Sequence, residues 1–313
     1  VVVQEAFSTT ATCAYADLLL PASTWGEKDG TVTNSERRIS RVRSAMAAVG
    51  EARDDWRIAA DFARRLAARL HPERASGFAY TTPESVWNEH RESTRGRDLD
   101  ITGLSYVALE ASPQQWPFPE GAASGCARLY EDGIFPTDNG RARFVDTPYV
   151  KLAEPRDVRY PFSLNTGRLR DQWHGMSRTG TIGRLFGHVP EPAIDMHGQD
   201  MQRLGVADGD LVQVTSKRGS IVLPAKASEQ QGLAQAFIAM HWGDEFLSGS
   251  TSIGERAAGV NALTSPAFCP SSKQPELKHA AVKILKATLP WKLLCVAWLG
   301  DVDALRAREQ LKP

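Results

Sequence analysis

Asn165-Thr-Gly-Arg-Leu-Arg-Asp-Gln-Trp-His174 follows the apolar run Tyr160 to Leu164, which predicts a β-strand that leads into an Asn-Thr-Gly turn. A glycine at the end of a strand lets the backbone approach a ligand closely. Two arginines, an amide, an indole and an imidazole follow, and these groups suit phosphates and polar heterocycles. The stretch predicts a binding turn for a large anionic, heteroaromatic ligand. A polar surface turn with scattered arginines is the alternative.

The sequence after this turn predicts further short elements. Leu211–Thr215 and Ser220–Leu223 flank Lys217-Arg-Gly219 and read as a hairpin. Asp200–Gly205 reads as a short helix, and Ala234–Met240 reads as another strand. Many short strands joined by tight turns indicate a closed barrel.

The first half of the chain has a different pattern. Val1–Phe7 and Asp17–Leu20 read as strands on either side of a short helix, Thr10–Tyr15, and this alternation favours a parallel α/β layer. The clearest helix runs from Asp54, its expected N-cap, to Leu70, with one apolar face. A further helix is expected to open at Thr82-Pro83.

Two segments of this half are irregular in pattern. Residues Trp25 to Arg43 carry polar groups too densely for an ordinary strand. We expect Glu27, Asn34, Glu36, Arg37 and Arg38 to form a buried structural network that pins a loop, with a substrate funnel as the alternative. Residues 110–157 read as a long connector that contains a hairpin signal, Asp138-Asn-Gly140.

Composition narrows the classes of function. The chain has 313 residues, which suggests about two domains, and its 37 basic and 37 acidic residues balance. This balance argues against a nucleic-acid partner or an anionic membrane surface. No apolar run approaches the ~20 residues that span a membrane. Val1 opens the chain in a strand-like run without an initiator Met, so we expect an internal piece of a longer polypeptide.

The cysteines indicate the cellular compartment. Cys13, Cys126, Cys269 and Cys295 are far apart in the sequence and form no Cys-x-x-Cys pair. We expect reduced, mostly buried thiols in a cytoplasmic protein, and no iron–sulfur ligand set within this chain.

A family resemblance rests on three groups of segments in order. They are Ala16-Asp-Leu-Leu-Leu-Pro-Ala22 with Glu27-Lys-Asp-Gly-Thr31 and Asn34-Ser-Glu-Arg-Arg38, then Asn165-Thr-Gly-Arg168 with Asp171-Gln-Trp-His174, then Val260-Asn-Ala-Leu-Thr264 with Lys273-Gln-Pro-Glu-Leu-Lys278. Together they resemble the C-terminal half of the molybdopterin oxidoreductases, the dimethyl sulfoxide reductase superfamily. The Asp-Gln-Trp-His version is most similar to catalytic subunits of assimilatory nitrate reductases. Formate dehydrogenases tend to carry a different pair where Trp173-His174 stands.

The resemblance implies a fold and a cofactor. The expected architecture is the end of an α/β (Rossmann-like) domain with connector, residues 1–150, then a six-stranded double-psi β-barrel, residues 157–287. Residues 288–313 would begin a truncated C-terminal extension. The implied cofactor is molybdenum bis(molybdopterin guanine dinucleotide), and the barrel would cover one side of it. A 4Fe-4S cluster and the cysteine that ligates molybdenum would lie in the missing N-terminal part.

The resemblance also implies which residues of this chain contact the cofactor. The candidates are Thr166, Gly167, Arg168, Gln172, Trp173, His174, Ser177, Arg178, His241, Asn261 and Lys278. A satisfied core histidine is the alternative for His241, a turn cap for Asn261, and a solvated surface amine for Lys278. Related sequences often have an Asp-Pro pair near Cys269-Pro270, so an acidic guanine contact would be missing there. No metal ligand and no catalytic residue is expected in this chain.

The expected function is the cofactor-binding portion of a molybdenum nitrate reductase, which reduces nitrate to nitrite in nitrate assimilation. A formate dehydrogenase of the same superfamily is the second interpretation, and a non-catalytic scaffold subunit that keeps the fold is the third. The expected partners are the N-terminal half of the same enzyme and an electron-donor protein or reductase subunit. We expect this chain to be inactive by itself, because it offers no molybdenum ligand.

Overall fold

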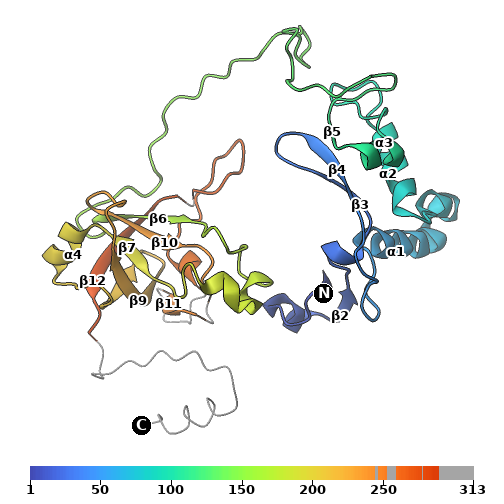
Figure 1. Ribbon diagram of the computed structural model, residues 1–313. Coiled ribbons are helices and arrows are strands. Elements are labelled where there is room, and N and C mark those ends of the chain that lie inside the picture. Colours follow the sequence, from blue (N-terminus) through green and yellow to red (C-terminus); the bar gives the residue numbers. More distant parts are fainter. Residues whose placement is uncertain (244–245, 252–258, 277, 289–313) are drawn as a thin grey trace. The chain divides into compact units, whose positions relative to one another are not determined.

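The computed structural model describes residues 1–243, 246–251, 259–276 and 278–288. The chain divides into two compact units, Val1–Tyr149 and the described residues from Val150 onward (Figure 1). Residues 289–313, which include Cys295 and almost all of the expected C-terminal extension, lie outside the described part. Among the described residues, no helix combines the length and apolar character needed to cross a bilayer.

A parallel pair of strands opens the first unit. β1 (Val2–Glu5) and β2 (Leu18–Pro21) pair in register Val2 to Leu18, with the 3-10 helix η1 (Ala11–Tyr15) between them. These are the strand, helix and strand that the sequence predicts. Parallel strands need a crossover between them, and the helical turn provides it here.

The polar segment from Trp25 to Arg43 forms regular structure, so the prediction that it is no ordinary strand is wrong. After η2 (Trp25–Glu27), β3 (Gly30–Thr33) and β4 (Arg38–Val42) form an antiparallel hairpin, and β5 (Gln114–Gln115) joins β4. Of the nine strand residues in β3 and β4, only Ile39 is buried. One solvated face explains why an antiparallel pair tolerates so many polar side chains.

The polar cluster of this hairpin is not the buried network that we expected. Asn34 closes the turn, because its Oδ1 accepts from the backbone N–H groups of Glu36 and Arg38 at 3.1 and 2.9 Å. Glu27 instead accepts at 2.7 Å from the Thr24 N–H and caps η2. Arg37 donates to carbonyl oxygens of the connector, including that of Ala127 at 2.8 Å. These are separate, partly exposed local contacts.

The helices of the first unit are α1 (Asp55–Leu70), η3 (Pro72–Phe78), α2 (Pro83–Glu92) and α3 (Tyr106–Ala111). Thr82 caps α2 in a capping box, as its sequence predicts. Asp54 does not cap α1 with its side chain; its carboxylate accepts from the Ser23 hydroxyl at 2.7 Å instead. The expected apolar face of α1 is largely exposed, with Phe62 at 66%.

A small core lies elsewhere in the first unit. It consists of Ile39, Trp87, Ile101, Leu104, Leu109 and Phe118. The connector beyond it does not contain the predicted hairpin. Asp138-Asn-Gly140 is a turn, closed by the Gly140 N–H donating to the Thr137 carbonyl at 3.0 Å, and no strand flanks it.

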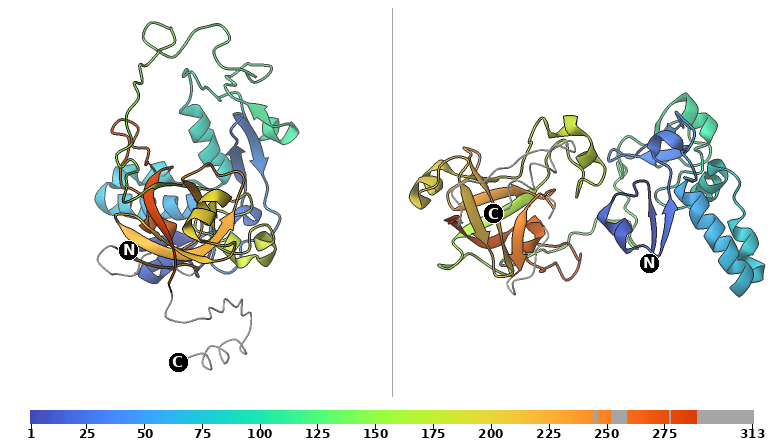
Figure 2. Two further views of the ribbon diagram at one scale, coloured as in Figure 1. Left: turned by 90° about the vertical axis from the view of Figure 1, so that its left-hand side faces the viewer. Right: turned by 90° about the horizontal axis from the view of Figure 1, so that it is seen from below.

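The second unit is a closed barrel of six strands. They are β6 (Phe162–Gly167), β7 (Ile194–Met196), β8 (Leu211–Thr215), β9 (Gly219–Ala227), β10 (Gln235–Ala239) and β12 (Ala280–Lys286). The ring runs β6–β10–β7–β9–β8–β12 and returns to β6, and β11 (Ser248–Thr251) pairs with β9 outside it. Figure 2 shows these strands curving around one interior. The predicted hairpin is β8–β9, and the predicted strand before Met240 is β10.

The ring has an internal two-fold relation. Exchanging β6, β7 and β8 for β9, β10 and β12 maps every pairing onto another pairing of the same sense. The parallel pair β6–β10 maps onto the parallel pair β9–β7, and the antiparallel pair β8–β9 maps onto β12–β6. Two interlocked crossover motifs of this kind make a double-psi barrel. The predicted barrel architecture is therefore confirmed.

The barrel interior explains how the strands are held. Fully buried aliphatic side chains from every ring strand meet there, among them Leu164, Ile194, Val212, Ile221, Ile238 and Val282. Helix α4 (Gly198–Leu204) ends at Gly205, as predicted, and its buried Met201 joins this core. The first strand differs from our expectation, because β6 continues through Asn165 and Thr166 to Gly167.

Candidate functional site

The parallel strands β6 and β10 end side by side, directly before the loop that begins at Arg168. In the register of β6 and β10, Phe237 lies beside Asn165 and Ala239 lies beside Gly167. The Met240 N–H then donates to the Gly167 carbonyl at 2.8 Å. The loop that leaves β6 and the chain that leaves β10 are therefore neighbours at one edge of the barrel.

Gly167 allows the Phe237 ring to pack close to the backbone at the end of β6. A Cβ atom at this position would lie 2.9 Å from the Phe237 ring, closer than real side chains pack, and 3.8 Å from Lys278 Nζ. The same Nζ donates to the Thr166 carbonyl at 2.6 Å. The fold thus brings Lys278 to Thr166 and Gly167, from which it is more than a hundred residues away in the sequence. The Thr166 side chain itself is buried.

Three predicted side chains share an exposed surface just beyond Gly167. The Arg168 guanidinium carbon lies 5.7 Å from the Trp173 ring centroid, in cation–π range. Trp173 meets the His174 ring edge-on, with centroids 4.5 Å apart, and remains 51% exposed. A cation, an indole and an imidazole therefore form one solvent-facing group, which can stack on a heterocycle and donate to an anion.

Gln172 does not face a ligand, contrary to the prediction. Its side chain is buried, its Oε1 accepts from the Thr179 hydroxyl at 2.7 Å, and its Nε2 donates to the Leu185 carbonyl at 3.3 Å. Thr179 also accepts from the Trp173 N–H at 3.2 Å. The amide therefore stabilises the loop from inside. Sequence reasoning missed Thr179, whose hydroxyl could have been flagged only as a local hydrogen-bonding group.

His241 also lies inside, which corrects its assignment to the cofactor contacts. The ring is 1% exposed, and both nitrogens bond to backbone groups: Nε2 accepts from the Leu169 N–H at 2.9 Å, and Nδ1 donates to the His174 carbonyl. This is the alternative of a satisfied core histidine. Neither ring nitrogen is left to bind a ligand.

The remaining candidates are exposed. Ser177 and Arg178 lie in the same loop as His174. Asn261 lies in the 3-10 helix η6 (Val260–Ala262), where its backbone carbonyl accepts from the Thr264 hydroxyl at 3.1 Å. Its side-chain amide has no hydrogen-bond partner among the described residues, so it does not cap a turn there. The geometry leaves this amide available to a ligand.

Asp171, within the stretch Asn165 to His174, forms local charge pairs that the sequence did not reveal. Asp171 accepts from Arg170 Nε at 2.9 Å and lies 3.5 Å from His188 Nδ1. Hydrogen bonding to Arg170 and the charge of that residue hold the pKa of the Asp171 carboxyl below its usual value, with a smaller contribution from His188. Within the described part of the chain, no cluster of metal-ligating side chains occurs.

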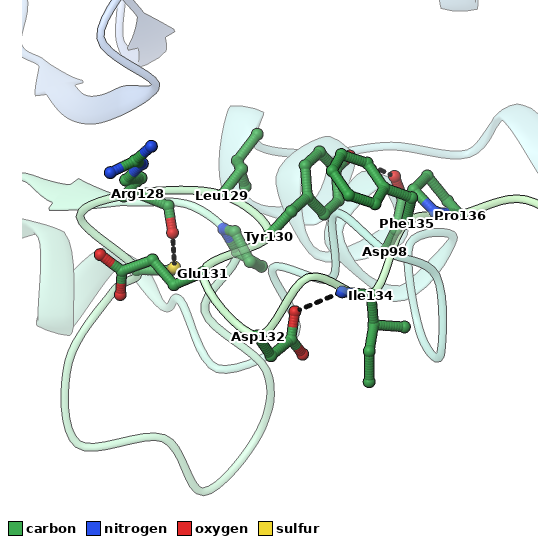
Figure 3. Close-up of a pocket in the computed structure, with 11 residues that line it drawn as sticks. Asp98, Arg128, Leu129, Tyr130, Glu131, Asp132, Ile134, Phe135 and Pro136 are labelled. Carbon is green, nitrogen blue, oxygen red and sulfur yellow. Dashed lines mark hydrogen bonds between the residues drawn. The ribbon is translucent and has the colours of Figure 1, made fainter. Parts of the chain in front are cut away.

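A cavity of about 470 Å³ lies in the first unit. Figure 3 shows its lining, which comes from Asp98 and the irregular connector around Tyr130 and Phe135. Those two rings stack with centroids 5.0 Å apart, and Asp132 accepts from the Ile134 N–H at 2.9 Å. The cavity contains none of the predicted contacts, so cavity size does not identify the candidate site.

Cys269 is exposed, and the other two described cysteines are half-buried, contrary to the expected buried thiols. Hydrogen bonds from the Ser272 hydroxyl and from the Ser272 and Ser271 N–H groups lower the pKa of the Cys269 thiol. The thiolate is the nucleophilic form of cysteine, so this lowered pKa favours reaction at Cys269.

We therefore expect iodoacetamide near pH 7.5 to alkylate Cys269 before Cys13 and Cys126, as read by peptide mass spectrometry. Ser272→Ala should slow the reaction at Cys269, and an unchanged rate would contradict this account.

Two family models match the chain. The molydopterin dinucleotide binding domain covers residues 162–281, which include β6 to β10 and the first two residues of β12, and the molybdopterin oxidoreductase model covers residues 1–65. The loop from Gly167 to Arg178, Asn261 and Lys278 all lie within the first match. The exposed polar surface described above is thus in the part of the chain that resembles a dinucleotide-binding domain.

Similar proteins agree with these matches. A nitrate reductase of Synechocystis is 40% identical over 90% of this chain, and the alpha subunit of an F420-dependent formate dehydrogenase of Methanocaldococcus jannaschii is 35% identical over 90%. The chain spans only 38% of each relative. The solved structure of acetylene hydratase from Pelobacter acetylenicus covers 91% of this chain and 40% of its own, with a TM-score of 0.60 at 19% identity. That last likeness concerns the fold alone.

Proposed function

Because the chain belongs to the molybdopterin oxidoreductase superfamily, we propose that it is the C-terminal, cofactor-binding portion of a molybdenum nitrate reductase that serves nitrate assimilation. One observation carries the proposal. The loop that follows the parallel pair β6–β10 displays Arg168, Trp173 and His174 beside the close-approach glycine, Gly167.

The residues present fit a molybdopterin guanine dinucleotide. Arg168, Arg178 and Lys278 carry positive charge suited to its pyrophosphate, and the Asn261 amide offers both a donor and an acceptor to a heterocycle edge. The missing side chain at Gly167 lets the Phe237 ring pack against the end of β6, which fixes the strand from which the loop leaves. Gln172 and His241 shape the loop from inside and do not touch the ligand.

In the proposed enzyme, molybdenum supplies the oxygen-atom transfer that reduces nitrate to nitrite. The residues of this chain bind and orient the organic part of the cofactor and contribute no metal ligand. The molybdenum ligand and a 4Fe-4S cluster would belong to a part of the enzyme outside this chain, which spans only 38% of the length of these relatives. An electron-donor protein or reductase subunit would complete the system. The free thiols of Cys13, Cys126 and Cys269 support a cytoplasmic location.

A formate dehydrogenase is the second candidate, because the Methanocaldococcus relative is 35% identical. We favour nitrate because the Synechocystis nitrate reductase is more similar, at 40% identity, and because Asp171-Gln-Trp-His174 resembles the nitrate reductase version of this motif. Assays of the full-length enzyme with nitrate and with formate decide between them. Formate oxidation without nitrate reduction would rule out the first proposal, and a metal-free full-length protein would favour a scaffold.

The test of the site uses Arg168→Ala and Trp173→Ala in the full-length enzyme. We expect the molybdenum content, measured by elemental analysis, to fall about tenfold or more in each variant, because the loop loses its cation or its stacking surface. Arg170→Ala is the matched control: this arginine lies in the same loop but pairs with Asp171 at 2.9 Å. Equal molybdenum content in all variants would refute the site.

A further inference from the structure

We propose that His241 is a positioning residue that holds the loop from Arg168 to His174 in its ligand-binding conformation. This inference rests on the proposed function in one respect: it takes this loop to be the part of the chain that contacts the ligand. His241 lies directly after the parallel pair of β10 with β6, and Met240 is bonded to Gly167. The ring is thus fixed to the barrel at the place where the loop leaves it.

The two ring nitrogens bridge the two ends of the loop. Nε2 accepts from the Leu169 N–H at 2.9 Å, near the start of the loop, and Nδ1 donates to the His174 carbonyl at its end. Because a carbonyl can only accept, Nδ1 carries a proton, and because the Leu169 N–H can only donate, Nε2 carries none, so the ring is neutral in this arrangement. Water cannot replace either bond in the folded protein, since the ring is 1% exposed.

The bridge meets the loop at its most strained point. His174 has a φ of +43° and Met176 a φ of +59°, a region that residues other than glycine adopt only when their surroundings enforce it. Two contacts enforce it here. The Met176 side chain is 4% exposed in the barrel core, and the His174 carbonyl is held by the buried His241 ring.

Removing the bridge would therefore release the part of the loop that carries the exposed group. His174 is itself one of the strained residues, Trp173 directly precedes it, and Arg168 lies over the Trp173 ring. None of these three side chains contacts His241 through its own polar atoms in the described structure. His241 acts on them through the backbone, so it is a positioning residue and not a ligand contact.

A second buried histidine gives a matched control. His279 is 8% exposed, and its Nε2 donates to the Glu154 carbonyl at 2.9 Å while its Nδ1 accepts from the Ser163 hydroxyl at 2.8 Å. It is thus the opposite tautomer and holds a different segment. Nitrogen-15 NMR of the 313-residue chain should show a proton on Nδ1 of His241 and on Nε2 of His279. A proton on Nε2 of His241 would overturn the bridge.

Substitution tests the positioning role. In His241→Phe, which fills the site without polar atoms, the Leu169 amide should exchange with solvent about tenfold faster, the factor expected for one lost buried hydrogen bond. His279→Phe should leave that amide unchanged relative to the amides of β12. If His241→Phe folds poorly, His241→Asn should show the same faster exchange, because its amide can place a donor near the Nδ1 position but is too short to place its oxygen at the Nε2 position. Unchanged exchange in both His241 variants would overturn the proposal.

Ligand binding is measured separately with guanosine diphosphate as the probe. His241→Phe should weaken its binding to the chain about tenfold, while His279→Phe should not. Faster exchange with unchanged affinity would overturn the positioning role. If the unaltered chain does not bind the probe, the proposed cofactor site fails, and the tautomer and exchange results still decide whether His241 bridges the loop.

Discussion

Gly259→Ala should destabilise the barrel unit by roughly 3 kcal/mol. Gly259 has a φ of +61° and a ψ of −164°, a combination open essentially to glycine alone. A Cβ there would also lie 2.4 Å from the Trp242 carbonyl oxygen, which is backbone and cannot turn away. Since Gly259 directly precedes η6, the same change should displace Asn261 and weaken cofactor retention.

The measurement is urea unfolding of the 313-residue chain, followed by the amides of β12. Gly183→Ala is the control, because Gly183 lies in the same unit and an added Cβ would meet nothing within 4 Å. We expect that control to change the free energy of unfolding by less than about 0.5 kcal/mol. Similar midpoints for both variants would show that the backbone at Gly259 relaxes without cost.

The sequence predicted the barrel well because local pattern and tertiary structure agree there. In β8 and β9, buried residues alternate with less buried ones on either side of a Gly-containing turn, and the matching sequence pattern identified the hairpin. The closed ring itself could not be derived from pattern. Its parallel pairs join β6 to β10 and β7 to β9, and no local signal specifies such distant partners.

The first unit was harder to predict for a physical reason. The hairpin β3–β4 has one solvated face, so its polar residues mask the strand signal. Helix α1 shows the opposite case. Its apolar stripe predicts a buried face, yet Phe62 and Leu70 are 66% and 63% exposed. An apolar stripe in the sequence indicates that a helix face is suited to packing against another segment. Whether that face is buried depends on which other segments pack against it.

The candidate site could also be predicted only in part from the sequence. The types of residue that bind an anionic heterocycle are visible in the sequence, and Gly167, Arg168, Trp173 and Lys278 do lie near one another. The direction of each side chain is not visible. Gln172 and Trp173 are adjacent, but one is 6% and the other 51% exposed, because the Gln172 amide bonds inside the loop to Thr179 and Leu185.

Leu164→Ala should remove roughly 3 kcal/mol from the stability of the barrel, within the range for buried leucines. Leu164 is fully buried in β6. Its strand neighbours Ala236 and Ala280 are small and buried, so neither side chain can fill the space that the leucine would leave. A cavity that cannot collapse costs the lost contacts as well as the lost transfer free energy.

Leu285→Ala is the matched control, because this leucine of β12 is 45% exposed and its loss leaves no cavity. We expect it to shift the unfolding free energy by less than about 1 kcal/mol. Leu164 also lies three residues before Gly167 on the strand that leads into the loop. If the barrel is the rigid support of that loop, Leu164→Ala should speed amide exchange at Leu169 together with the β6 amides. Equal stability of the two variants would mean that the core does not fix the strand that carries the site.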